Sequence, residues 1–543
     1  MESAVTRFWD LPELVNMVLL FSTSQSIARL MRTNKSLYRS GPTVLYHSFN
    51  SFQTWRMFSG SAGISGLIKH AEHIRSISLA REFCLRFIVG TTSCDSADAS
   101  SSPRVATVFP HLPNLTSFTC ELERSYGSSH SQSEAAIERD AFPTSIARAL
   151  RGCPRLVSLQ LGQLFIDNEE FIDSICKSFS ELKMLDAIDL TLLIPKVGLS
   201  DKVVAKLFFS LPQSTKTVSI VVTSRYGTND RTTNYARYPP NFPRRKEPLS
   251  KLTSLRAQFP GGFDADTVLA IMDHCPEVVT LEIPVLERGQ GEAYVSQHIV
   301  DCCPKLADLS LHFDDDCDVS TSLMTEIIKS MPENTLQSIY VEGYHDHDTN
   351  LADSLQRHFG SLIKIEFEET RHFDGYFLEI VLHGCQVLEV LTVDGRRAGC
   401  FGVPLKDILL YKWVSKSLRD LQFAVKFPNM RELDAMEVPS GSKTKSKPGV
   451  ITEAQKKGST LLGTLYRKIR FLENLENLQL QLSLEDWEES LKFTSSGPGF
   501  LYGGEVKSGR PLSYHRFETL KELKKNPMYG WGSDSDDYAS SSP

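Results

Sequence analysis

Long apolar runs are missing from this sequence of 543 residues. No uninterrupted apolar stretch approaches the ~20 residues of a membrane-spanning helix, so we expect no membrane contact. The early stretch 14–21 contains Asn16 and follows acidic residues instead of a basic segment, which argues against a secretory signal. A strong excess of one charge is also missing, because 66 acidic and 59 basic residues give a net charge of −7. This balance argues against non-specific binding of nucleic acid by the whole chain.

Catalytic signatures are lacking as well. The sequence has no Gly-rich phosphate loop ending in Gly-Lys-Ser/Thr, no Gly-x-Ser-x-Gly and no His-Glu-x-x-His. We therefore expect a protein that is not an enzyme and needs no cofactor. His345 and His347 would point apart on a strand and have no third ligand at a metal-binding spacing, so no metal site is predicted. The eleven cysteines are an odd number, which favours a reducing compartment, the cytoplasm or the nucleus.

An internal phrase recurs along the chain. It reads Cys-Pro-x-apolar-x-x-Leu-x-apolar and starts at Cys153, Cys275 and Cys303, and a copy without the proline starts at Cys385. Its apolar-x-x-apolar-x-apolar part has first anchors at residues 252, 278, 306, 336, 362, 388 and 418, which are separated by 26, 28, 30, 26, 26 and 30 residues. Such near-constant spacing indicates structural repeats.

Each repeat combines two kinds of periodicity. Before the phrase lies a segment of helical period, as at Leu323, Ile327 and Ile328, which gives a helix one buried stripe. The phrase itself predicts a short strand whose alternate residues point inward. One helix and one strand cannot close a core alone, so the units are expected to stack and to share a continuous core.

These phrases resemble leucine-rich repeats of the longer, helix-containing type, over roughly residues 74–482. The resemblance implies an α/β leucine-rich-repeat solenoid, with a curved parallel sheet inside and helices outside. In this register the cysteines of the recurring phrase share one position, at the turn that enters the strand. Stacking spaces them along the solenoid, so a small buried turn residue is a better interpretation than a metal ligand.

Residues 9–46 do not follow the repeat. They contain Pro12, which suits the first turn of a helix, and Asp10 and Glu13, which suit the positive end of that helix. Three short apolar helices within this length would bury little surface. Such a module usually needs a partner to cover it.

This segment resembles an F-box, of the form found in fungal proteins with degenerate leucine-rich repeats. The matches are the opening Leu-Pro-Glu at 11–13, the apolar pair at 18–19, the second helix at 27–30 and the leucine–aromatic pair at 45–46, whereas Ser22 and Thr33 depart from the family's pattern. The resemblance implies a substrate receptor of an SCF-type cullin–RING ubiquitin ligase that docks on a Skp-family adaptor. The implied adaptor contacts are Leu11, Pro12, Val18, Leu19, Ile27, Leu30, Leu45 and Tyr46. The alternative is a helical cap on a repeat scaffold that has no part in ubiquitin transfer.

The predicted organisation has three parts. An F-box-like helical module occupies 1–50, the solenoid occupies 51–485, and a C-terminal extension with a disordered acidic and serine-rich tail occupies 486–543. Insertions interrupt the repeats near 91–104, 122–138, 224–249 and 438–459. Residues 225–246 interleave arginines with aromatic residues, a pattern that would suit phosphates or single-stranded RNA. A surface insertion between repeats is the favoured interpretation, and nucleic-acid binding is disfavoured.

One part of the array is strongly acidic. Residues 301–370 contain 15 acidic and 4 basic residues, a net charge of −11. The acids predicted to point out of the strands and to contact the target are Glu282, Asp308, Glu342, Glu366, Glu368 and Asp394. Like charges held so closely repel each other, which suggests a target with a basic surface. Ordinary solvation of an exposed face explains the pattern equally well.

Overall fold

The structure is a computed structural model. It describes residues 11–33, 35–50, 69–80, 112–121, 142–166, 169–194, 200–223, 245–258, 263–283, 286, 291–312, 319–342, 349–368, 375–393, 403–404, 413–426, 472, 474–475 and 477–483. The predicted insertions lie largely outside these residues, and the C-terminal extension, His345, His347 and Asp394 lie wholly outside them. The chain divides into two compact units, the first made of residues 1–291 and 301–305 and the second of residues 292–300 and 306–543. The boundary falls at helix α13 (Glu292–Cys302).

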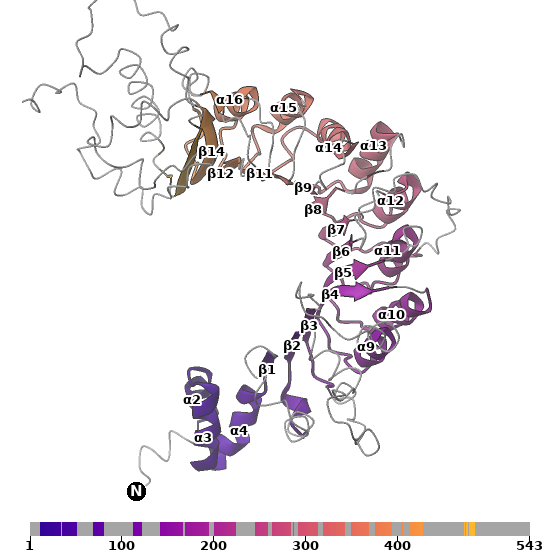
Figure 1. The fold of residues 1–543 in the computed structure, drawn as a ribbon, viewed down its shortest axis with the longest axis vertical. Coiled ribbons are helices and arrows are strands. Elements are labelled where there is room, and N and C mark those ends of the chain that lie inside the picture. The colour runs from indigo at the N-terminus through magenta and orange to yellow at the C-terminus, as the bar shows by residue number, and fades with distance from the viewer. Residues whose placement is uncertain are drawn as a thin grey trace, which may run out of the picture. The chain divides into compact units, whose positions relative to one another are not determined.

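The first unit begins with a three-helix module and continues as a sheet of parallel strands in chain order (Figure 1). The module contains α2 (Pro12–Leu20), α3 (Ser24–Thr33) and α4 (Lys35–Leu45). The strands are β1 (Ser48–Asn50), β2 (Ser76–Ala80), β3 (Ser117–Glu121), β4 (Ser158–Phe165), β5 (Ala187–Leu193), β6 (Thr217–Thr223), β7 (Ser254–Gln258) and β8 (Thr280–Glu282). The remaining helices are η1 (Ala71–His73), α9 (Phe142–Arg151), α10 (Glu169–Glu181), α11 (Ser200–Phe209) and α12 (Ala265–Met272).

The second unit repeats the same arrangement of one strand followed by one helix. Its strands are β9 (Asp308–His312), β10 (Ser338–Glu342), β11 (Lys364–Glu368), β12 (Val390–Val393), β13 (Val403–Pro404), β14 (Asp420–Lys426) and β15 (Asn477–Ser483). Its helices are α14 (Val319–Ser330), α15 (Thr349–Leu355), η5 (Gln356–His358) and α16 (Gly375–Gly384). Strands β9 to β12 and β14 pair in that order, and β13 and β15 both pair with β14.

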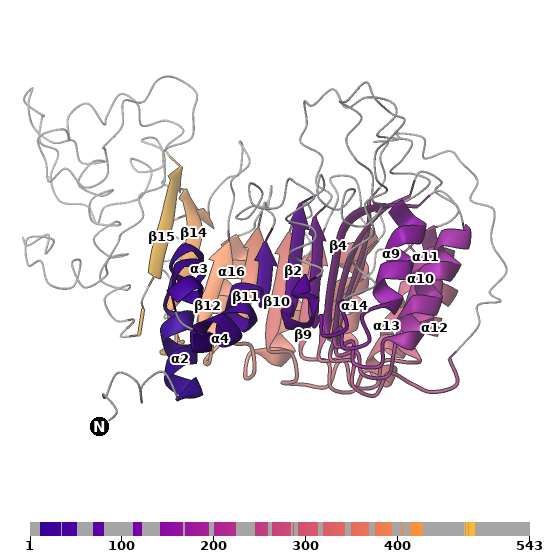
Figure 2. The same ribbon diagram turned by 90° about the horizontal axis from the view of Figure 1, so that it is seen from below.

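Helices and strands form two layers in each unit. In Figure 1, α9 to α12 lie on one side of β4 to β8, and α14 to α16 lie on one side of β9 to β12; Figure 2 shows α9 to α12 beside β4 in a second view. Every strand pairing among the described residues is parallel. The fold is therefore an α/β leucine-rich-repeat solenoid, as the recurring phrase predicts. No helix in the described part of the chain has both the length and the apolar composition needed to cross a membrane.

The predicted anchors carry the core of both units. Residues 252 and 278 in the first unit and 306, 336, 362, 388 and 418 in the second are all buried. Equivalent inward residues lie opposite each other in register, so that Leu309, Ile339, Ile365, Leu391 and Leu421 make one continuous row. Each strand thus adds one apolar side chain to every row, and the row length grows with each repeat.

A single backbone carbonyl that accepts two hydrogen bonds recurs at repeat boundaries in both units. In the first unit, the carbonyl of Thr116 accepts hydrogen bonds from the N–H groups of Val157 at 2.8 Å and Ser158 at 2.9 Å. In the second unit, the carbonyl of Gln337 accepts from Ile363 at 2.8 Å and Lys364 at 3.1 Å. These hydrogen bonds pair backbone groups that the strands alone would leave unpaired. They also keep successive repeats in the same register.

The recurring cysteines are buried at the turns that enter the strands. The thiol of Cys153 donates to the carbonyl of Ala149 at 3.4 Å, and that of Cys275 donates to the carbonyl of Ile271 at 3.2 Å. Burial raises the pKa of Cys153, Cys303 and Cys385 to about 12, so these thiols stay protonated. Their predicted role as small buried turn residues is confirmed.

Candidate protein-binding surfaces

The three-helix module has a small core of its own. Val15 and Leu19 of α2, Ile27 of α3 and Leu37 of α4 are buried together. Around them pack the half-buried side chains Leu30, Met31, Val44 and Leu45. The predicted start of α2 is confirmed, because Pro12 occupies its first turn.

The departures from the F-box pattern have local structural roles. The hydroxyl of Ser22 donates to the carbonyl of Val18 at 2.7 Å and so satisfies an acceptor in the last turn of α2. The hydroxyl of Thr33 likewise donates to the carbonyl of Leu30 at the end of α3. Between the two helices, the hydroxyl oxygen of Thr23 accepts from the N–H of Ser26 at 3.2 Å, which is the bond of an N-cap.

The structure distributes the predicted adaptor contacts over three environments. Leu19 and Ile27 lie in the core, Leu30 and Leu45 pack against that core, and these four side chains hold the module together. Leu11 is exposed and Val18 is half-buried. Tyr46 stacks on His70 of the repeat array. The side chain of Pro12 lies outside the described part of the module.

An exposed apolar face on α2 was missed by the sequence analysis. It consists of Met17, Leu20 and Phe21, of which Leu20 is 70% and Phe21 is 91% exposed. These positions are three and four residues apart and so lie on one side of the helix. The run Met-Val-Leu-Leu-Phe at 17–21 carried the signal, because five consecutive apolar residues cannot all face one core. We call Met17, Leu20 and Phe21 the α2 face; Tyr38 of α4 is a further exposed aromatic residue.

The acidic residues of the second unit share the outward side of β9, β10 and β11. Buried and half-buried residues alternate along these strands, and Asp308, Glu342, Glu366 and Glu368 take half-buried positions. The register places Glu342 opposite His312 on one side and opposite Glu368 on the other. The predicted outward orientation of these four acids is therefore confirmed.

Much of this negative charge already has partners within the unit. The ring Nδ1 of His312 lies 2.6 Å from Oε2 of Glu342, and Nζ of Lys364 lies 2.7 Å from Oε2 of Glu366. The hydroxyl of Tyr340 donates to Glu368 at 3.1 Å. Burial, together with Glu342 and Glu368, raises the pKa of Tyr340, so the phenol stays a donor. The repulsion that suggested a basic target is thus partly offset by the protein's own side chains, and a basic target stays a prediction.

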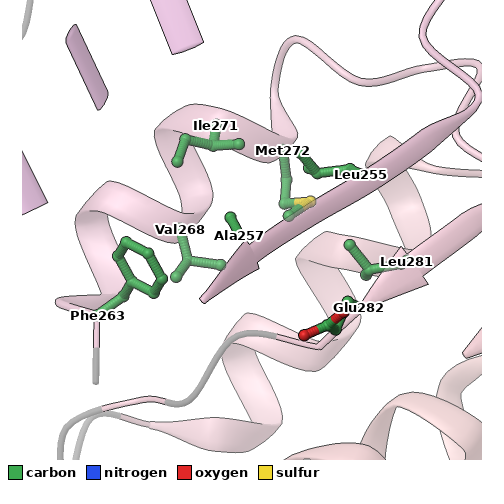
Figure 3. Close-up of a pocket in the computed structure, with 8 residues that line it drawn as sticks. All are labelled: Leu255, Ala257, Phe263, Val268, Ile271, Met272, Leu281 and Glu282. Carbon is green, nitrogen blue, oxygen red and sulfur yellow. The ribbon is translucent and has the colours of Figure 1, made fainter. Parts of the chain in front are cut away.

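Glu282 is a different case, and its expected outward exposure was wrong. It is only 5% exposed, and its Oε2 lies 2.9 Å from Nε of Arg256 on the neighbouring strand. Figure 3 shows it beside a cavity of about 10 Å³ whose other lining side chains are apolar. That volume accommodates at most about one water molecule, so the cavity is not a ligand site. A carboxylate held by a neighbouring guanidinium in such a setting is unsuited to contact a target.

We predict that charge reversal on the outward face lowers affinity for a cationic peptide. Glu342→Lys with Glu366→Lys changes the local charge by four units, and binding of a short poly-lysine peptide at low salt is expected to weaken by about tenfold or more. Glu326→Lys on α14 is the control, because Glu326 pairs with Lys329 on the helix layer and away from the strands. Equal binding by all three proteins in fluorescence titrations would show that the acidity serves solvation.

Arg245 has a structural role at the end of α11. It is the described arginine within the aromatic and basic stretch 225–246, and its Nη1 donates to the carbonyl of Phe209 at 3.1 Å and to that of Leu211. Its Nε donates to the carbonyl of Glu247 at 3.3 Å. Arg245 therefore binds the free carbonyls that follow α11, and desolvation lowers its pKa. The rest of the candidate nucleic-acid segment up to residue 244 lies outside the described residues.

We expect Arg245→Ala to destabilise the first unit by about 2 kcal/mol, because the substitution leaves the carbonyls at the end of α11 without their donor. Lys246→Ala removes the same charge from the next, exposed residue and is expected to change stability by less than about 0.5 kcal/mol. Urea denaturation of both variants measures the difference. Equal stability of the two variants would contradict the capping role.

Similarity of this chain to known proteins is low. No protein-family model matches the sequence, and neither does any curated protein. The leucine-rich repeat-containing protein LegL7 from Legionella pneumophila is 12% identical, with a TM-score of 0.30, over 60% of this chain and 84% of that chain. A chain of the complex of Rad7 and Elc1 in yeast is 13% identical, with a TM-score of 0.34, over 76% of this chain and 90% of that chain. Both similarities are low, so the repeat fold rests on the strand pairing and the buried anchors.

Proposed function

We propose that this protein is the substrate-recognition subunit of an SCF-type cullin–RING ubiquitin ligase. Its helical module docks on a Skp-family adaptor, and the outward strand face of its repeats binds the target protein. The receptor itself performs no chemistry and promotes transfer by holding the target near the ubiquitin-loaded enzyme. We place it in the cytoplasm or nucleus. The F-box-like segment 11–46 and the order of the two modules support this proposal.

The α2 face is the observation on which the proposal depends most. A phenylalanine that is 91% exposed beside a leucine that is 70% exposed leaves a large apolar area in water. Burying each of these side chains in an interface stabilises a complex by about 1.5–3 kcal/mol. Exposed aromatic and aliphatic residues of this kind are typical centres of protein interfaces. Leu11 and Tyr38 are further exposed apolar residues of the same module.

The direct experiment is adaptor binding by the full chain. We expect a purified Skp-family adaptor and the purified protein to co-elute as a stable complex in size-exclusion chromatography. Elution of the two proteins as separate species at micromolar concentration would contradict the proposal.

A scaffold without ubiquitin transfer is the second candidate, and one observation favours it. Strand β1 follows the module directly and pairs with β2, so the module is attached to the edge of the sheet as a cap would be. The sheet thus begins at Ser48, within the 1–50 range predicted for the module. A cap needs only its core residues, whereas an adaptor-binding module needs its exposed face. Substitutions confined to the α2 face therefore separate the two functions.

A further inference from the structure

The junction between the helical module and the first repeat is built from stacked rings. The ring of Tyr46, directly after α4, lies over that of His70, with centroids 4.4 Å apart and an interplanar angle of 13°. The ring of His70 in turn lies 6.1 Å from that of His73 at an angle of 28°. Nδ1 of His73 also lies 3.5 Å from the hydroxyl oxygen of Thr43 in α4. Two contacts thus connect α4 and the residue after it with η1 and the residue before it.

The backbone continues this junction into the sheet. The carbonyl of His47 accepts hydrogen bonds from the N–H groups of Arg75 at 2.9 Å and Ser76 at 3.1 Å. This is the same two-donor carbonyl that marks the repeat boundaries, so the module joins the array as a repeat does. Strand β1 begins at the next residue, with Ser48 opposite Ser76. No flexible linker separates Tyr46 from the sheet, because His47 is the only residue between them.

We propose that Tyr46, His70 and His73 lock the helical module to the repeat array, and that Tyr46 is a positioning residue rather than an adaptor contact. This inference rests on the proposed function, because the lock matters only where the distance and direction from adaptor to target must be constant. If the helical module were joined to the repeats by a flexible linker, it would present the target to the ligase in many orientations. Ring stacking and the two-donor carbonyl remove that freedom.

The protonation state of the His70 ring affects the stability of the lock. The titratable and charged groups facing it are His73, Lys69 and Glu72, with Tyr46 on the side of α4. Glu72 is also 3.5 Å from Nε2 of His73. Burial, His73 and Lys69 lower the pKa of His70, and Glu72 opposes them. Because the folded pKa is below the unfolded value of about 6.5, the neutral ring stabilises the junction above that pH, and the stabilisation is lost as the pH falls.

Hydrogen exchange at the amides of Arg75 and Ser76 measures the lock in the full chain. Tyr46→Ala is expected to lower the protection of both amides by about tenfold or more at pH about 7.5, whereas Tyr46→Phe keeps the ring and the protection. In wild-type protein, protection corrected for intrinsic exchange should fall between pH about 7.5 and about 5.5. His70→Phe keeps a stacked ring without a titrating group and should weaken that pH dependence.

Adaptor binding separates the lock from the proposed function. Tyr46→Ala is expected to bind a purified Skp-family adaptor within about twofold of wild type, because Tyr46 faces the array. Tyr38→Ala, at an exposed tyrosine of α4, is the control that should leave amide protection unchanged. Unchanged protection in Tyr46→Ala together with a large loss of adaptor affinity would overturn the lock and restore Tyr46 as an adaptor contact. If wild-type protein does not bind the adaptor, the proposed function fails, and the exchange data still decide whether the lock exists.

Discussion

Replacing Leu20 and Phe21 by aspartate is expected to lower affinity for a Skp-family adaptor by about a thousandfold. Central interface residues commonly contribute about 2 kcal/mol each or more, and about 4 kcal/mol corresponds to that factor. Introduced carboxylates would also have to lose their hydration on binding. Because the two side chains are 70% and 91% exposed, the substitutions should change the free energy of unfolding by less than about 0.5 kcal/mol. Isothermal titration calorimetry with purified adaptor measures the affinity.

Met184→Asp is the matched control for this experiment. Met184 is an exposed apolar residue of the repeats that lies three residues before β5, outside the helical module. Its substitution should leave adaptor affinity unchanged. An equal loss in both proteins would indicate a non-specific effect of surface charge, and no loss in either would favour the capped scaffold.

The second large effect is expected at His358, in the turn between α15 and β11. His358 is fully buried, and its Nε2 lies 3.1 Å from the carbonyl of Ile328 while its Nδ1 accepts from the N–H of Leu336 at 3.3 Å. The ring is therefore neutral, with its proton on Nε2. His358→Phe keeps the ring but leaves a buried carbonyl and a buried N–H without partners. We expect the free energy of unfolding to fall by about 3–5 kcal/mol. Each unpaired group accounts for about 1–3 kcal/mol of this loss, and the altered packing adds to it.

The stability of the second unit should also depend on pH through this residue. Desolvation lowers the pKa of His358 below its unfolded value of about 6.5. The unfolded chain then binds the proton more tightly, so the stabilisation is complete above that pH and is lost as the pH falls through it. Urea denaturation at pH about 7.5 and about 5.5 measures the loss, which His358→Phe should reduce. Gln356→Ala, at an exposed residue of the same turn, is the control. A His358→Phe variant as stable and as pH-dependent as wild type would refute the buried neutral ring.

The repeat architecture was predictable because its determinants are local and periodic. Each repeat is specified by an anchor every 26 to 30 residues, by a helical apolar stripe before the anchor and by alternating apolar residues after it. Such repeats bury their apolar sides by stacking on one another. The buried cysteines followed from the same register. The environment of these residues depends on their position within the repeat, and it is the same whichever neighbouring repeat packs against them.

The functional surfaces were less predictable. At the end of α2 the sequence has five consecutive apolar residues, and only packing against α3 and α4 decided that Leu19 is inside and that Phe21, the C-cap, is outside. Motif matching alone selected Leu19 and missed Phe21, because a family pattern combines residues that build a module with residues that contact a partner. The environment of Tyr46 was not predictable from the motif either, because its stacking partner His70 lies 24 residues further along the chain.

By itself, the sequence determined the class of the fold, its repeat period, the buried anchors and the separate character of the first helices. The tertiary structure alone decided which charged and apolar groups are available to a partner. Glu282 shows the reason: alternation predicts an outward carboxylate, but Arg256 on the preceding strand lies beside it, and only 5% of Glu282 is exposed. Periodicity reports the side of a strand on which a residue lies, whereas exposure depends on side chains contributed by other repeats.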